Sequence, residues 1–530
     1  MAGREWWRDG VIYQIYPRSF QDSNRDGIGD LAGIIGQLDY LEWLGIDAIW
    51  LTPITVSPDA DMGYDVSDYC GVQPVFGDLE RAETLIAEAD RHGIKIVLDI
   101  VPNHTSDRHP WFIDARASRR ARHRDWYVWA DPRSDGGPPN NWVSQFGGPA
   151  WTLDERTGQY YLHNFLPEQP DLNWWSPDVR DAFDGIYRFW FDRGVAGFRI
   201  DVAHGIVKDR ELRDNPPATA DDTPWLQRLG QRPIYNTERP EVHDVLRRWR
   251  ALADTYQPPR ILLGETYVLD VRSMGRFYGQ GDELHLAFNF TYVHAPFQAP
   301  ALAEVVAESE LVLGDHNWPV WTVSNHDVSR VMTRWGGGDE RKLRCALLSL
   351  LTLRGTPVLY YGDEIGMPDT PIGKDDLQDP LGKRYWPQPR GRDPERTPMP
   401  WRNTSGAGFT DAGARPWLPI GDAAVRNVED QRRDPASTLC FTRDLIALRR
   451  ETGDLQEGPY RQLPSPADAW VWQRGRSTIV AVNLSDRQVR IPEVAGGIKL
   501  ATARSRDGER LTGTLTLGPW EGAVCSSESI

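Results

Sequence analysis

The chain has 530 residues, of which 40% are hydrophobic, and a formal net charge of −16. A chain of this length buries a large core and is expected to form more than one domain. Its 76 acidic residues against 60 basic ones argue against general binding to nucleic acid or to anionic lipid.

Short apolar runs alternate with longer amphipathic stretches along most of the chain. The apolar runs are predicted to be strands: 11–16, 46–52, 94–101, 195–202, 260–265, 284–290, 320–325 and 357–362. Their largely continuous apolar character is typical of parallel strands that are buried on both faces. A helical pattern such as 31–44, which ends at Gly45, lies between successive runs. These βα units predict an α/β fold, a (β/α)8 TIM barrel.

Two segments depart from this alternation. Residues 105–175 are rich in Trp, Pro, Gly and Arg, and they are too long for a structureless loop. We expect them to form an inserted domain over the barrel mouth, after the third strand. From residue 457 to 530, short strands follow one another without helices, which predicts a C-terminal antiparallel β-sandwich. The barrel would then comprise residues 1–104 and 176–456.

Three of the predicted strands end at or just before an acidic residue, namely Asp201, Glu265 and Asp327. The C-terminal ends of the strands of such a barrel surround one pocket, so distant acids can meet there. Cleavage of a glycosidic bond requires one carboxyl group to protonate the leaving oxygen and another to attack the sugar carbon. The three acids therefore predict a glycosidase site.

Basic and imidazole groups accompany these acids. Arg199 shares a strand face with Asp201 and is expected to keep it ionised, as a nucleophile must be; a structural ion pair is equally compatible with this pattern. Glu265, near other acids and partly desolvated, is expected to supply the proton of a general acid. His104 and His326 are interpreted as neutral donors to sugar hydroxyls, or as satisfied structural groups.

Oxygen-bearing residues recur in the loop from Asp22 to Asp30. The candidate ligands are the side chains of Asp22, Asn24, Asp26 and Asp30 and the carbonyl of Ile28. Gly33 replaces the glutamate that ends an EF-hand loop, and a strand precedes the loop instead of a helix. We expect one structural hard cation, with an acidic glycine-rich turn as the alternative.

Taken together, these residues resemble the α-amylase superfamily, glycoside hydrolase family 13, and most of all its α-glucosidase and oligo-1,6-glucosidase branch. The resemblance runs from about residue 7 to 409. It is carried by segments 99–104, 197–204, 264–266 and 324–327, with 11–20 and 396–399 in agreement. Segment 169–173 in the inserted region points to the glucosidase branch.

The resemblance implies that Asp201 is the nucleophile, Glu265 the acid/base and Asp327 the transition-state stabiliser. It also implies a set of substrate-binding residues: Asp61, Tyr64, His104, Phe146, Phe165, Arg199, His326, Arg330 and Arg396. Arg396 would pair with Asp61 at the closed end of the pocket. The metal of the Asp22–Asp30 loop would be calcium or magnesium, and no organic cofactor is expected.

The activity expected from this resemblance is that of a retaining exo-α-glucosidase. It would release terminal α-D-glucose from short α-1,4-linked oligosaccharides or α-glucosides, with some transglucosylation. Val202 after the nucleophile is associated with α-1,6 activity, so an oligo-1,6-glucosidase stays open, as does a sucrose- or trehalose-active transglucosidase. Residues 331–336 do not match the Arg/Asp-rich loop of sucrose isomerases. A non-catalytic glucosidase-like subunit is the remote alternative. Such relatives have lost the catalytic acids, whereas this chain retains all three.

The expected partners are small α-glucosides, with neither nucleic acid nor membrane, and both a monomer and a homodimer are compatible with the sequence. The four cysteines lack CxxC spacing, which argues against a zinc site and indicates no disulfide framework. The N-terminus has no apolar signal segment, and no apolar run reaches the roughly 18 residues of a membrane span. We therefore expect a soluble, cytoplasmic protein.

Overall fold

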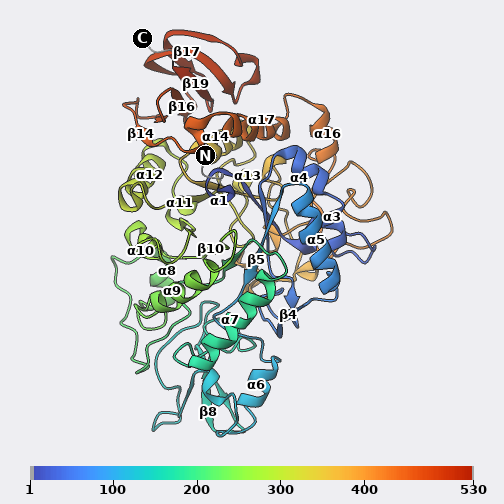
Figure 1. Ribbon diagram of the computed structural model, residues 1–530, viewed down its shortest axis with the longest axis vertical. Coiled ribbons are helices and arrows are strands. Elements are labelled where there is room, and N and C mark those ends of the chain that lie inside the picture. Colours follow the sequence, from blue (N-terminus) through green and yellow to red (C-terminus); the bar gives the residue numbers. More distant parts are fainter. Residues whose placement is uncertain (1–4, 528–530) are drawn as a thin grey trace.

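The computed structural model describes residues 5–527, and a ring of parallel strands forms its centre (Figure 1). The strands are hydrogen-bonded in the order β11-β10-β9-β5-β2-β1-β13-β12. A parallel bridge from Phe288 to Val320 links the two ends of this order. The bounds are β1 Ile12–Ile15, β2 Ala48–Leu51, β5 Lys95–Ile100, β9 Gly197–Ile200, β10 Ile261–Gly264, β11 Leu286–Ala287, β12 Val320–Thr322 and β13 Thr356–Tyr360. The predicted (β/α)8 barrel is confirmed.

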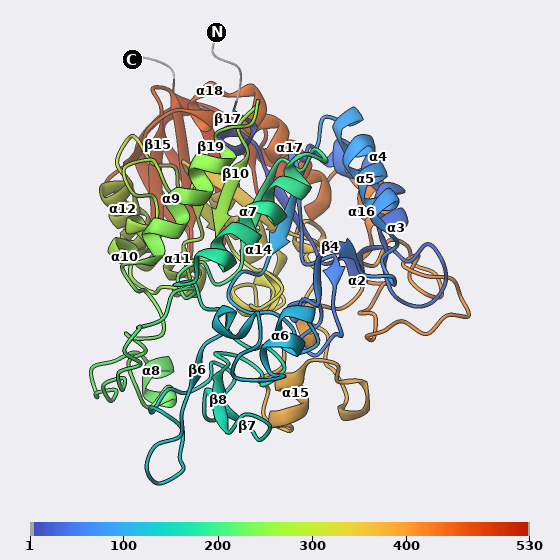
Figure 2. The same cartoon turned by 60° about the horizontal axis from the view of Figure 1, so that its bottom comes forward.

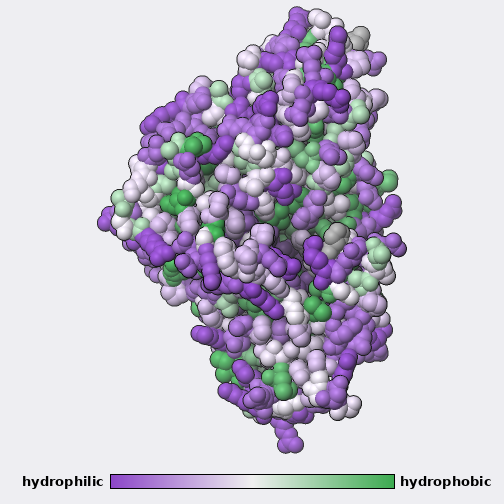
Figure 3. Space-filling model, turned by 180° about the vertical axis from the view of Figure 1, so that it is seen from behind, coloured by the Kyte–Doolittle hydropathy of each residue, from purple (hydrophilic) through white to green (hydrophobic). Residues whose placement is uncertain are grey.

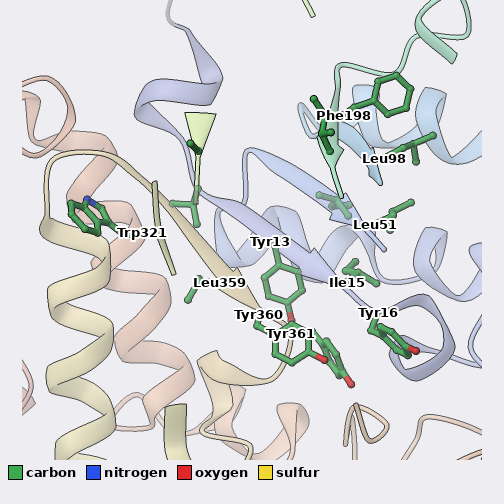
Figure 4. Close-up of a cluster of buried hydrophobic side chains, with 14 of the residues drawn as sticks. Tyr13, Ile15, Tyr16, Leu51, Leu98, Phe198, Trp321, Leu359, Tyr360 and Tyr361 are labelled. Carbon is green, nitrogen blue, oxygen red and sulfur yellow. The ribbon is translucent and has the colours of Figure 1, made fainter. Parts of the chain in front are cut away.

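Both faces of the barrel strands are buried, which explains their continuous apolar runs. Ile12, Trp50 and Leu263 belong to the cluster that fills the barrel interior. The alternate residues pack outward in the larger core under the helices, and Figure 4 shows several of them, such as Leu51 and Phe198. Successive side chains of a strand point to opposite faces, so one short run supplies both layers.

Helices surround the barrel. The longer ones are α5 Leu79–Arg91, α7 Pro177–Phe191, α9 Val242–Ala253, α12 Ala299–Leu313, α14 Glu340–Thr352 and α17 Thr438–Glu451. The predicted helix 31–44 is divided into α3 Leu31–Ile35 and α4 Leu38–Leu44. Gly45 ends α4 with a φ of 95°, a left-handed conformation that favours glycine.

Shorter elements complete the barrel layer. The short helices are α1 Trp6–Asp9, α2 Pro17–Phe20, α8 Pro224–Leu229, α10 Val271–Arg276, α11 Phe290–His294, α13 Val331–Arg334, α15 Pro380–Tyr385, α16 Val428–Arg433 and α18 Gly453–Gln456. β3 Thr55–Val56 and β4 Asp68–Val72 form an antiparallel pair beside the barrel.

The chain between β5 and α7 forms a small unit with its own sheet. It contains α6 Pro110–Ala115 and the antiparallel strands β6 Trp129–Ala130, β7 Trp151–Asp154 and β8 Gln159–Leu162, in the order β6-β8-β7. Trp142, Trp151 and Leu162 form a separate apolar cluster there. In Figure 1 this unit lies at the opposite end of the molecule from the C-terminal strands. A domain division at residues 105 and 175 stays a prediction.

The C-terminal strands belong to one antiparallel sheet, where the sequence analysis expects a sandwich. The order is β14-β15-β16-β19-β17-β18, with β14 Tyr460–Gln462, β15 Ala469–Arg474, β16 Thr478–Asn483, β17 Val489–Ala501, β18 Arg510–Leu517 and β19 Gly522–Ser527. β17 pairs with both β18 and β19, and its register shifts in both pairings. Such shifts increase the local bend and twist of a strand. The arrangement of these strands as a sandwich stays a prediction.

The surface of the protein is largely polar. Figure 3, which shows the face opposite to that of Figure 1, has mostly hydrophilic residues with hydrophobic ones scattered among them. Within residues 5–527, no helix has both the length and the apolar character required to cross a membrane.

Candidate active site

A cavity of about 620 Å³ lies at the C-terminal ends of the barrel strands, and the inserted unit contributes to its wall. Asp201 follows β9, Glu265 follows β10, and Asp327 lies beyond β12. All three acids line this cavity. Figure 2 shows the elements around its mouth, with α8 and α15 on either side of the small sheet of the inserted unit. The structure thus brings together the three acids that the sequence singled out.

Arg199 joins two of these acids to a third buried carboxyl group. Its Nη1 donates to Oδ1 of Asp201 at 2.7 Å and to the carboxylate of Asp99 at 2.9 and 3.0 Å. Its Nη2 lies 3.0 Å from Oε2 of Glu265, which also accepts the N–H of Val202 at 2.9 Å. Val202 has a φ of 47°, an uncommon conformation for a β-branched residue. The guanidinium of Arg199 therefore contacts three carboxyl groups.

Arg199 acts on the pKa of Asp201 in the predicted direction, but burial outweighs it. Burial raises the pKa of Asp201 well above its ordinary value; Arg199 opposes this, while Glu265 and Asp99 add to it. Burial likewise raises the pKa of Asp99 to about 7, against the influence of Arg199. The expectation that Arg199 keeps Asp201 ionised treated the two residues as an isolated pair. In the free protein the carboxyl groups of Asp99 and Asp201 titrate together and share protons, so this pair can hold one protonated acid beside one ionised acid.

A pH prediction follows from this arrangement. An attacking carboxylate must be ionised, so the raised pKa of Asp201 should move the acidic limb of kcat/KM above the pH at which an ordinary carboxyl group, with a pKa of about 4, titrates. Asp99→Asn removes a negative neighbour, lowers the pKa of Asp201 and should shift that limb to lower pH. The measurement is kcat/KM against pH for both proteins. A limb that stays in place or moves upward would contradict the coupling.

The third acid lies between two arginines, and one of them also contacts Asp61. Oδ1 of Asp327 accepts from Nη2 of Arg396 at 2.7 Å and from Nη1 of Arg392 at 3.1 Å. Nη2 of Arg392 donates to Asp61 and to Asp379, in both cases at 2.6 Å. The predicted pairing of Arg396 with Asp61 is therefore wrong, and Arg392 occupies that position. The two arginines flank the turn η4 Asp393–Glu395, and only the folded loop determines which of them reaches Asp61.

These arginines also set the charge of Asp327. Burial alone would raise the pKa of its carboxyl group, but His326, Arg392 and Arg396 bring it below the ordinary range. For Asp61, burial outweighs Arg392, and its pKa is raised. Asp327 is thus a stable anion, which suits a group that faces developing positive charge.

The two histidines occupy different positions. His326 is fully buried, and it contacts Nε2 of Gln14 through Nδ1 at 2.8 Å and the hydroxyl of Tyr64 through Nε2 at 2.6 Å. Burial lowers its pKa well below the ordinary value, so it is neutral. His104 lines the cavity, and burial lowers its pKa to about 4. His326 lies behind Tyr64, which lines the cavity, whereas His104 itself lines the cavity.

Of the other predicted binding residues described next, the two phenylalanines line the cavity and the arginine does not. Phe146 and Phe165 line the cavity, with ring centroids 5.4 Å apart in an edge-on arrangement. Arg330 is fully buried; its Nη1 donates to the carbonyl of Tyr361 at 2.6 Å, and its backbone N–H donates to Asp369 at 2.8 Å. It is not among the residues that line the cavity, so the structure does not bring Arg330 together with the acids.

The Asp22–Asp30 loop lies apart from this cavity. Its carboxylates accept backbone N–H groups of the loop: Oδ1 of Asp22 from Arg25 at 2.7 Å, and Oδ1 of Asp26 from Ile28 at 2.8 Å. Oδ1 of Asp30 caps α3 by accepting the N–H of Gly33 at 2.7 Å. These contacts shape the loop and hold several oxygen donors in one short segment. An all-oxygen donor set suits a hard cation such as Ca²⁺ or Mg²⁺. Among the described residues, the carboxylates of Asp22, Asp26 and Asp30 do not all lie within 4.8 Å of one another, so an ion would have to draw them together.

Three residues of this site were assigned no role from the sequence. Asp99 binds Arg199, Arg392 binds Asp61 and Asp327, and Gln169 donates to Oδ2 of Asp61 at 3.2 Å. Gln169 and Asp99 both belong to segments that carried the family resemblance, which is the signal that could have identified them. Arg392 differs from its neighbour Arg396 only in the contacts of the folded loop.

Comparison with known proteins gives consistent matches over nearly the whole chain. Residues 14–458 match the alpha amylase catalytic domain, and residues 465–524 match a domain of unknown function. A "probable alpha-glucosidase" of Rhizobium meliloti (strain 1021) is 44% identical over 86% of this chain and 84% of its own length. An oligo-1,6-glucosidase of Heyndrickxia coagulans is 36% identical over 98% and 99%.

Solved structures give matches of similar extent. The alpha-glucosyl transfer enzyme XgtA superposes with a TM-score of 0.92 at 40% identity and covers 99% of both chains. The trehalulose synthase MutB superposes with a TM-score of 0.90 at 32% identity, over 99% of this chain and 100% of its own.

Proposed function

The chain belongs to the α-amylase family of glycoside hydrolases, and on that premise we propose that it is a retaining, exo-acting α-glucosidase. It would release terminal α-D-glucose from short gluco-oligosaccharides or α-glucosides and transfer part of that glucose to other acceptors. The observation that carries this proposal is the contact of Asp201 and Glu265 with one guanidinium, with Asp327 in the same cavity.

The proposed reaction has two steps. The carboxylate of Asp201 attacks the anomeric carbon while Glu265 gives its proton to the leaving oxygen, which yields a glucosyl ester on Asp201. Glu265 then takes a proton from water, and the water oxygen displaces the Asp201 carboxylate and releases glucose. The anion of Asp327 supports the positive charge that develops on the sugar ring. Because each step inverts the anomeric carbon, the product keeps the α configuration.

The exo mode of action rests on the closed end of the cavity. Arg392 bridges Asp61, Asp379 and Asp327, and Gln169 from the inserted unit contacts Asp61. Such a bridge leaves no path for further sugar units beyond the first. A single terminal glucosyl unit would therefore fill the inner end of the cavity.

Linkage preference is the finer part of the proposal. We assign α-1,4-linked substrates with some tolerance of α-1,6 linkages. Val202, which lines the cavity directly after the nucleophile, favours the alternative of an oligo-1,6-glucosidase. Relatives named as oligo-1,6-glucosidases support that alternative as well.

Hydrolysis of maltose and isomaltose followed by proton NMR tests both points. The first glucose to appear should be the α anomer, released from the non-reducing end, and maltose should be cleaved faster than isomaltose. Initial release of β-glucose would overturn the retaining mechanism. Products of internal cleavage from maltoheptaose would overturn the exo assignment.

We also propose that the Asp22–Asp30 loop holds one structural Ca²⁺ or Mg²⁺. An ion that binds only the folded protein stabilises it in proportion to its occupancy. Removal of the ion with EDTA should therefore lower the Tm and leave activity measurable well below the new transition; Asp26→Asn should lower the Tm and weaken the response to added Ca²⁺. An unchanged Tm would contradict the proposal, and so would complete loss of activity while the fold persists.

A further inference from the structure

The outer part of the active-site cavity has an apolar wall. Its side chains come from α8 and the loop that follows it, from the loop after β10 and from α15: Trp225, Leu226, Ile234, Val268, Leu269 and Leu381. Ile234 and Leu269 are 49% and 39% exposed, so large hydrophobic groups face solvent at the cavity rim. This outer wall contrasts with the inner end, where the acids and Arg392 lie.

Polar side chains in the outer part are mostly engaged within the protein. The pairs are Arg232 with Asp222 at 2.8 Å, Thr237 with the carbonyl of Pro233 at 2.7 Å, Tyr267 with His294 at 2.9 Å, and Asp270 with the backbone of Ser273 at 2.7 Å. Among the described lining residues, Glu238, which is exposed, and Gln145 are exceptions. A second sugar would lose water from its hydroxyls here and find few partners to replace it, which is costly.

The outer wall is also fixed in place. The loop that follows β9 is bound to the inserted unit through Trp142, whose Nε1 donates to the carbonyl of Arg213 at 2.8 Å, and through Asn236, which donates to Asn164 at 2.9 Å. Gln231 adds a third bond, to the carbonyl of Asn141 at 2.7 Å. Because these bonds exist before a ligand arrives, little ordering is required for an apolar group to bind.

We infer that the outer wall is a subsite for an alcohol that carries an aromatic ring, both as the leaving group of an α-glucoside and as an acceptor in transfer. The inference rests on the proposed glucosidase function and specifies its substrate class. An apolar ring gains from leaving water on this wall, whereas a sugar ring does not. Water remains the competing acceptor.

The transfer step follows the chemistry of hydrolysis. The alcohol oxygen attacks the anomeric carbon of the Asp201 glucosyl ester as the bond from that carbon to the Asp201 oxygen breaks. Glu265 takes the alcohol proton, and Asp201 leaves as a carboxylate. The product is the α-glucoside of the alcohol, and no other reactant is required.

Competition between acceptors tests the inference. α-D-glucosyl fluoride forms the same glucosyl ester whatever the acceptor, so the ratio of transfer products reports the acceptor subsite alone. With benzyl alcohol and glucose at equal concentration, both of which offer a primary hydroxyl, benzyl α-glucoside should exceed the disaccharides by about tenfold. A ratio near one, or in favour of the disaccharides, would overturn the inference.

Serine substitutions on the outer wall and at a distant site test whether this wall determines the ratio of transfer products. Ile234→Ser and Leu269→Ser should each lower the product ratio several-fold, whereas Leu311→Ser, the same change at a site that is 76% exposed on α12, should leave it unchanged. An equal ratio in all three variants would also overturn the inference. If glucosyl fluoride is cleaved and acceptor preference is absent, the glucosidase proposal stands alone. If neither glucosyl fluoride nor maltose is cleaved, both proposals fall.

Discussion

Asp201→Ala is expected to reduce kcat on an α-glucoside by on the order of 10⁴-fold or more, because the covalent step loses its nucleophile. Arg199 keeps Asp99 and Glu265 as partners in this variant, so the fold should persist. Added azide can enter the space that the carboxylate occupied and attack the anomeric carbon from the same side. The product should then be β-D-glucosyl azide, identified by NMR.

Glu265→Ala should give the opposite stereochemistry. An α-glucoside with a leaving group that needs no protonation still forms the ester on Asp201, and azide then displaces Asp201 to give α-D-glucosyl azide. For poor leaving groups the loss in kcat should be about 10²–10⁴-fold, the usual contribution of a general acid.

A matched control separates these roles from general loss of a buried acid. Glu283→Gln alters a buried carboxylate that precedes β11 and pairs with His243 and Arg247, at the opposite end of the barrel strands. This variant should catalyse the same reaction as the wild-type protein and form no β-D-glucosyl azide. If the two azide products appeared in the reverse variants, the assignments of nucleophile and acid would have to be exchanged.

The second large effect is expected at Arg392. Arg392→Met should lower kcat/KM by about 100-fold, since Asp61, Asp379 and Asp327 all lose a cation that is bound in a largely buried position. Removal of one partner from a buried ion pair typically costs about 3–5 kcal/mol. The pKa of Asp61, which burial already raises, should rise further. The glucosyl subsite would then lose both its closure and an anionic hydrogen-bond acceptor.

A double-mutant cycle distinguishes the two arginines. Arg392→Met combined with Asp61→Asn should show a coupling free energy of about 1–3 kcal/mol in kcat/KM, the range for groups in contact. Arg396→Met combined with Asp61→Asn should couple more weakly, because Arg396 contacts Asp327 and the carbonyl of His326 instead. Stronger coupling to Arg396 would restore the pairing expected from the sequence.

The barrel itself was predictable because its signals are local. A parallel strand buried on both faces is a short apolar run, and each run from 11–16 to 357–362 overlaps a barrel strand of the structure. Asp201, Glu265 and Asp327 each lie within two residues of the end of such a run. Barrel closure brings strand ends together, so the position of an acid along its own strand was sufficient to assign it to the common cavity.

Other features depended on contacts between distant segments. Whether Arg392 or Arg396 reaches Asp61, and how many carboxyl groups share Arg199, are decided by side chains from several strands and loops. The pKa of Asp201 follows from burial and from every charge nearby: Arg199 lowers it as predicted, but burial, Glu265 and Asp99 raise it by more.

The sequence by itself determined the barrel, its family resemblance and the three acids, since periodicity and strand ends are properties of neighbouring residues. The tertiary structure alone decided which arginine contacts Asp61, the raised pKa values of Asp99 and Asp201, the pairing of the C-terminal strands and the apolar side chains that line the outer part of the cavity. Each of these arises where segments far apart in the chain pack together, and the energies of burial and charge are determined only at that point.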